Sequence, residues 1–72
     1  MELHERLKHV REDMDMSQAD VAAALGTTRQ QISKYETGLQ DMTAAKLYEF
    51  CRLYGISADY LLGLPRGLAW PR

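Results

Sequence analysis

Hydrophobic positions recur at helical spacing through most of this 72-residue chain, and no segment alternates apolar and polar residues as a half-buried strand does. Two long stripes stand out. The first consists of Leu3, Leu7, Val10 and Met14, and the second of Ala44, Leu47, Phe50, Cys51 and Tyr54. The first stripe predicts a helix of about three turns, and the second predicts a helix that Thr43 caps and Gly55 ends.

Two shorter helices between these stripes are predicted from their ends. Ser17 precedes Asp20 by three residues, and Thr28 precedes Gln31 by three residues, both of which are capping-box spacings. Gly26 stands between them, where a left-handed backbone can end a helix without a Cβ penalty. The sequence therefore predicts two helices joined by a tight turn at Gly26, the length a helix-turn-helix uses.

A short fifth helix is expected over 58–62, with Ser57 as its cap and Gly63 as its stop. The fold class is then all-α: a compact five-helix bundle with a helix-turn-helix at its second and third helices. The domain is expected to span 1–63, and the Pro- and Gly-interrupted apolar tail 64–72 cannot continue a helix.

The helix expected over 28–36 has two different faces when its residues are placed about 100° apart. Ile32 and Tyr35 fall on the apolar side together with Thr28. The other side carries Gln30, Ser33 and Lys34, flanked by Arg29 and Gln31. A merely solvated face is one interpretation. The other is DNA reading in the major groove, because arginine pairs well with guanine and glutamine with adenine.

The order and spacing of these motifs resemble the phage-repressor and Cro family of DNA-binding domains, also called the xenobiotic-response-element type. The resemblance covers Leu3 to Leu62. The matching pieces are Arg11, Ser17-Gln18, Val21-Ala22, Leu25-Gly26-Thr27-Thr28, Ile32-Ser33, Tyr35-Glu36, Gly38, Leu47, Phe50-Cys51, Gly55-Ile56 and Asp59-Tyr60-Leu61-Leu62. The chain departs from the family pattern at Met42, where many members have proline, and at Asp41 in a loop that usually approaches phosphate.

The resemblance implies a lambda-repressor-like domain and a role for each polar residue of the motif. Arg29, Gln30, Ser33 and Lys34 would face bases. The candidate phosphate contacts are Gln18, Thr28 and Gln31, of which Gln18 stands at a helix N-terminus, a natural anion site. Arg11 and Glu36 would form the family's internal ion pair, so Arg11 is not expected to touch DNA.

Charge and cysteine content limit other functions. A net charge of −1 and a pI near 6.0 argue mildly against a nucleic-acid partner. However, Asp20 and Glu36, the acids of the central segment, have capping and pairing roles. A lone Cys51 allows no intrachain disulfide and makes a thiolate metal site improbable. We expect no metal, no cofactor, no catalytic residue, no membrane span and no secretory signal, hence a cytoplasmic protein.

The expected function is that of a sequence-specific double-stranded-DNA-binding transcriptional regulator, a repressor, that reads the major groove with helix 28–36. An antitoxin-like regulator that also binds a protein, or an interaction module without DNA binding, are the alternatives. A homodimer on a palindromic site is expected, since one small domain offers few phosphate contacts. The surface expected to form the dimer, to pack the tail or to bind a protein partner consists of Tyr60, Leu64, Leu68 and Trp70.

Overall fold

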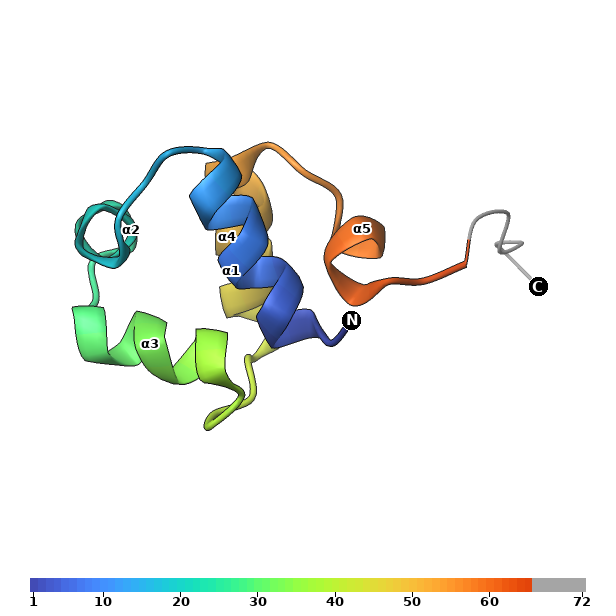
Figure 1. Cartoon of the computed structure of the whole chain (residues 1–72), viewed down its shortest axis with the longest axis horizontal. Helices are drawn as coiled ribbons and strands as arrows, with labels where there is room; N and C mark the ends of the chain where they lie inside the picture. Colours follow the sequence, from blue (N-terminus) through green and yellow to red (C-terminus); the bar gives the residue numbers. More distant parts are fainter. Residues whose placement is uncertain (66–72) are drawn as a thin grey trace.

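Five α helices and no strand make up residues 1–65, the part of the chain that this computed structural model describes (Figure 1). They are α1 (Leu3–Asp13), α2 (Gln18–Leu25), α3 (Arg29–Thr37), α4 (Ala44–Tyr54) and α5 (Ala58–Leu62). The predicted all-α, five-helix fold is confirmed. Leu68 and Trp70, two of the four residues predicted to pack the tail or form a dimer, lie outside the described residues.

Short-range hydrogen bonds set the ends of most helices. The hydroxyls of Ser17, Thr28, Thr43 and Ser57 each accept a backbone N–H from the residue three positions later, and the helices end at Gly26, Gly38, Gly55 and Gly63 in left-handed conformations. At Ser17 the capping box is complete, because the Ser17 N–H also donates to Asp20 Oδ2 at 2.9 Å. Only one of the two hydrogen bonds of the capping box predicted at Thr28 is present: the Gln31 backbone N–H donates to the Thr28 hydroxyl, but the Gln31 side chain bonds to Gln40 instead of to the backbone of Thr28.

The link between α1 and α2 corrects part of the predicted first stripe. Met14 caps the end of α1 and is 45% exposed, whereas Met16, two residues later, packs against the core. The chain reverses between them at Asp15, whose φ of +61° is a left-handed conformation that aspartate tolerates better than most residues. This turn moves the second methionine, rather than the first, toward the apolar interior.

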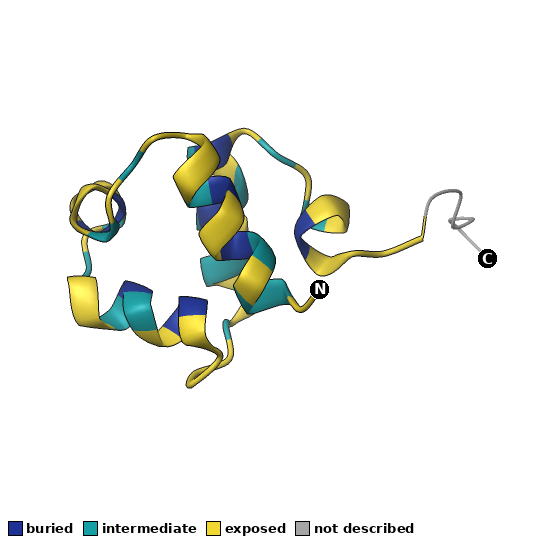
Figure 2. Ribbon diagram, in the orientation of Figure 1, coloured by how far each residue is buried: buried dark blue, intermediate teal, exposed yellow. Residues whose placement is uncertain are grey.

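All five helices contribute buried residues to one core, and Figure 2 colours these buried positions dark blue. Its buried members are Leu7, Val10, Val21, Ala22, Ile32, Tyr35, Phe50, Tyr54 and Leu61. Fully buried Phe50 is central: its ring meets Tyr35 edge-on and stacks on Tyr54, both at 5.9 Å between centroids. Ala44, predicted for the apolar stripe of α4, is exposed because it occupies the first helical position.

One close contact fixes the end of α3 against α1. Gly38 has a φ of +79°, and a Cβ built there would lie 3.0 Å from His4 Nδ1. The imidazole therefore packs directly on the glycine backbone, and His4 is half-buried rather than a plain surface residue.

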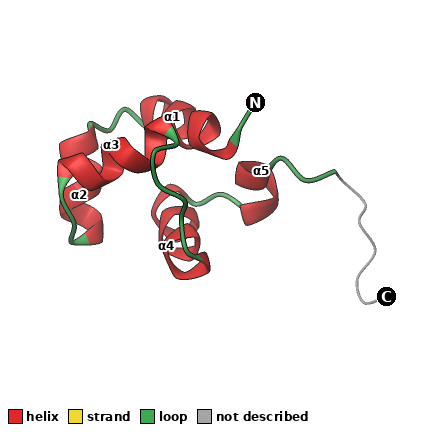
Figure 3. Cartoon of the chain, turned by 90° about the horizontal axis from the view of Figure 1, so that it is seen from below, coloured by secondary structure: helices red, strands yellow, loops and turns green. Residues whose placement is uncertain are grey.

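From below, α2 and α3 lie at one end of the molecule and α5 at the other (Figure 3). No helix within residues 1–65 combines the length and apolar character needed to cross a membrane.

Candidate nucleic-acid interface

A continuous polar face covers the outer side of α3. Ile32, Tyr35 and Glu36 of this helix are buried. The outer arc, about 140° wide at 100° per residue, we call the polar face of α3; it consists of Arg29, Gln30, Ser33, Lys34 and Thr37, and Gln31 lies beside it. All of these residues are exposed except Ser33, which is half-buried (Figure 2). The four residues predicted to face bases therefore share one side of one helix.

Thr37 is the member of this face that sequence reasoning missed. Its hydroxyl donates to the Ser33 carbonyl oxygen at 2.9 Å and lies 3.4 Å from the Lys34 carbonyl oxygen. Threonine commonly satisfies its hydroxyl in this way inside a helix. Helical spacing alone would have found it, because Thr37 is four residues after Ser33.

The three predicted phosphate contacts have different surroundings. Thr28 is exposed, and its Oγ1 accepts the Gln31 N–H at 3.1 Å, so the hydroxyl proton remains available to donate. The Gln31 side chain donates its Nε2 to Gln40 Oε1 at 2.8 Å, which braces the loop after α3. Gln18 is half-buried, and its Nε2 donates to Glu36 Oε1 at 3.1 Å.

Arg11 and Glu36 meet as a two-pronged ion pair beneath this surface. Arg11 Nε lies 2.7 Å from Glu36 Oε2, and Arg11 Nη2 lies 3.1 Å from Glu36 Oε1. The side chains are only 12% and 1% exposed, respectively. The hydrogen bond to Glu36 is the main reason that the pKa of Arg11 is raised. Because Arg11 Nη1 also donates to the Met16 carbonyl oxygen at 2.8 Å, this residue ties α1, the α1–α2 link and α3 together.

The distribution of charge favours an anionic partner at α3 despite the net charge of −1. Glu36 is buried against Arg11, and Asp20 accepts the Ser17 N–H, a bond that lowers the pKa of the Asp20 carboxyl. The polar face of α3 carries no carboxylate, and Arg29 and Lys34 form no salt bridge within residues 1–65. Two cations therefore remain available on this face.

The same described region shows no group of three His, Cys, Asp or Glu side chains placed to hold a metal ion. Cys51 is a free, half-buried thiol whose pKa is raised by burial. A buried thiol with a raised pKa is a poor nucleophile, because the reactive form is the thiolate.

A short helix, a tight glycine turn and a second helix with an exposed polar face together define a helix-turn-helix domain. The chain belongs to the helix-turn-helix family of the phage-repressor and Cro type, whose sequence profile matches residues 7–61.

Two bacterial relatives and one solved structure illustrate this membership. The chain is 35% identical over 63 residues to the HTH-type transcriptional regulator ImmR of Bacillus subtilis, covering 88% of this chain and 50% of that protein. It is 40% identical over 58 residues to the SPbeta prophage-derived HTH-type transcriptional regulator YonR of Bacillus subtilis, covering 81% and 54%. The chain thus spans about half the length of both relatives.

The structural comparison shows the same fold. The P22 c2 repressor, solved in complex with a synthetic operator, superimposes with a TM-score of 0.79 at 24% sequence identity, over 86% of this chain and 94% of that one. The predicted lambda-repressor-like architecture is confirmed.

Proposed function

We propose that this chain is a sequence-specific double-stranded-DNA-binding transcriptional regulator, acting as a repressor, and that α3 is its recognition helix. The observation that carries the proposal is the polar face of α3, which gathers donors and acceptors and two cations on one exposed surface. Relatives named as transcriptional regulators, and a fold shared with a repressor solved on an operator, support it. We assign it no catalytic role and place it in the cytoplasm, on the nucleoid.

In the proposed complex the polar face of α3 lies in the major groove. Arg29 offers a bidentate donor pair for guanine, and Gln30 offers one donor and one acceptor for adenine. Ser33 can meet either base type, and Lys34 can reach a base or a phosphate. Thr28 and Gln18, at the starts of α3 and α2, would hold the DNA backbone and fix the register of the helix.

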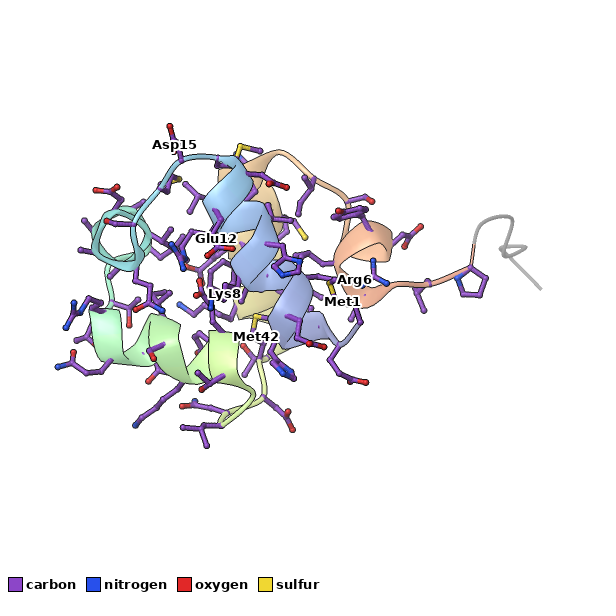
Figure 4. All side chains as sticks on the ribbon, in the orientation of Figure 1. Met1, Arg6, Lys8, Glu12, Asp15 and Met42 are labelled. Atoms are coloured by element: carbon purple, nitrogen blue, oxygen red, sulfur yellow. The ribbon has the colours of Figure 1, made fainter. Side chains whose placement is uncertain are left out.

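A two-fold homodimer is the proposed working state, because one nearly neutral domain makes few phosphate contacts. Two copies would read half-sites about 34–36 Å apart on a roughly palindromic site. We place the dimer surface at α5 and the chain directly after it, where Tyr60 is 54% and Leu64 is 44% exposed. Arg6 extends from α1 toward α5 and covers part of this surface (Figure 4), since its Cζ lies 6.0 Å from the Tyr60 ring centroid. The same surface could bind a different protein, which the dimer test below distinguishes.

The experiment that tests the proposal selects duplexes from a random DNA pool with the wild-type chain and then titrates the selected sequence. Arg29→Ala and Gln30→Ala should each cost about 1–3 kcal/mol on the selected duplex and relax the preference at particular base pairs. Arg52→Ala is the matched control for Arg29→Ala, because it removes the same charge from an exposed position on α4 and should change affinity little.

Two results would contradict the proposal at different levels. Equal losses on selected and random duplexes for Arg29→Ala and Gln30→Ala would remove these residues from base reading and leave them as general DNA contacts. Failure of the wild-type chain to bind any duplex at low salt would refute DNA binding itself, because electrostatic affinity is greatest there.

A further inference from the structure

Glu36 is a buried carboxylate that three N–H donors share. Its Oε2 accepts from Arg11 Nε at 2.7 Å, and its Oε1 accepts both Arg11 Nη2 and Gln18 Nε2 at 3.1 Å. Only 1% of the Glu36 side chain is exposed. The third donor, Gln18, is half-buried, so it links the buried pair to the surface.

The third donor fixes the side chain of Gln18 at the start of α2. A free glutamine side chain samples many rotamers, and ordering it on binding costs conformational entropy. In this structure the bond to Glu36 orders the side chain before any ligand arrives. The amide nitrogen carries two N–H groups, so one remains to donate to a phosphate while the other is held by Glu36.

The backbone beside Gln18 is held by the same network. Arg11 Nη1 donates to the carbonyl oxygen of Met16 at 2.8 Å, two residues before Gln18. Arg11 thus anchors both the carboxylate that orients the side chain and the link that leads into α2. The Gln18 side chain and the start of α2 are therefore positioned by the same buried ion pair.

We infer that Glu36 is a positioning residue for DNA binding, acting through Gln18, which it orients toward a phosphate of the duplex. The inference deepens the proposed function and rests on it. Under this assignment the ion pair of Arg11 and Glu36 preorganises a surface contact in addition to joining α1 to α3. Preorganised groups bind more tightly because less entropy is lost in the complex.

The test is a double-mutant cycle in DNA affinity, measured on the duplex that the wild-type chain selects. The variants are Gln18→Ala, Glu36→Gln and the double mutant, each titrated at a temperature where circular dichroism shows it fully folded. Each single change should weaken binding about 3- to 10-fold. In the Gln18→Ala background, Glu36→Gln should weaken binding by less than about 2-fold more, because the side chain through which Glu36 acts is absent.

Gln30→Ala supplies the matched control, because it removes the same side chain from the polar face of α3 and Gln30 makes no side-chain hydrogen bond within residues 1–65. Glu36→Gln should weaken binding equally with and without Gln30. An equal loss with and without Gln18 would overturn the inference, because Glu36 would then act through the fold alone. A wild-type chain that binds no duplex refutes the proposed function as well, whereas binding with an additive cycle refutes only the positioning role.

A measurement on the wild-type chain keeps the inference testable if Glu36→Gln does not fold. Side-chain ¹⁵N relaxation should give the Gln18 amide a higher order parameter than the Gln30 amide before DNA is added. The Gln18 signal should then shift on addition of the selected duplex. Equal mobility of the two amides, or an unshifted Gln18 signal, would overturn the inference.

Discussion

Replacing Arg11 by methionine tests the buried ion pair most directly, because methionine keeps much of the side-chain length and removes the charge. The change removes two of the three donors to Glu36, whose side chain is 1% exposed in the wild type, and leaves Gln18 as the third; it also removes the Arg11 bond to the Met16 carbonyl oxygen. A buried charge stripped of its partner is strongly destabilising, by about 3–5 kcal/mol. Because the Gln18 bond to Glu36 remains, we expect a loss of unfolding free energy at the lower end of this range, about 3 kcal/mol.

Removing the charge of Glu36 should lower the free energy of unfolding less than removing the charge of Arg11. Glu36→Gln keeps one acceptor for Arg11, whose side chain is 12% exposed and can meet water, so we expect a loss of about 2 kcal/mol. The double mutant removes both charges and should lose only about 3 kcal/mol, well below the sum of about 5. In a domain of this size 1 kcal/mol corresponds to about 4–8 °C in Tm, so Arg11→Met should lower Tm by about 12–24 °C.

Thermal and urea melts of the wild type, the two single mutants and the double mutant give the coupling free energy. The pair Lys46 and Glu49 is the control, since its Nζ–Oε2 distance is 3.4 Å and its side chains are 21% and 40% exposed. Its cycle should give a coupling below about 0.5 kcal/mol. Additive losses for Arg11→Met and Glu36→Gln would show that the buried pair contributes nothing beyond its separate side chains, and the reasoning would be wrong.

The remaining predictions concern Gly38, Tyr54 and the tail 64–72. Gly38→Ala should lower the free energy of unfolding by about 1 kcal/mol more than Gly26→Ala, because both have a positive φ but only Gly38 meets an imidazole at 3.0 Å; equal urea midpoints would contradict this. Tyr54→Phe should raise stability by about 1 kcal/mol in a thermal melt at pH 7, because the buried Oη has no hydrogen-bond partner within the described residues, and a lower Tm would show a hidden partner. Burial also raises the pKa of Tyr54 from 10.0 to about 12, so the free energy of unfolding should be unaffected by this group below pH 10 and should fall as pH rises through 12, because the unfolded chain loses the phenol proton first; Tyr54→Phe should flatten that decline. Deleting residues 64–72 should weaken self-association in analytical ultracentrifugation, whereas an unchanged mass and DNA affinity would leave the dimer to α5 alone, and a monomeric full chain would favour a different protein partner.

The order of helices and their ends could be predicted because they depend on neighbours in the chain. A hydroxyl at a helix start and a glycine at its end act within three or four residues, and the periods of the apolar stripes need only local geometry. For the same reason the polar face of α3 was predicted nearly whole, with only Thr37 missing. The departures at Met14 and Ala44 occur at helix ends, where periodicity stops predicting which side a residue faces.

The sequence by itself therefore determined the fold class, the helix-turn-helix and which side chains α3 presents to solvent. Only the tertiary structure decided the contacts between distant parts of the chain: Gln18 with Glu36, Gln31 with Gln40 and His4 on Gly38. It also decided that the buried hydroxyl of Tyr54 meets no hydrogen-bond partner within residues 1–65. The physical reason is range. Capping and periodicity act over one or two helical turns, whereas these contacts depend on how α1, α3 and α4 pack, and ångström-scale shifts in that packing decide which donor reaches which acceptor.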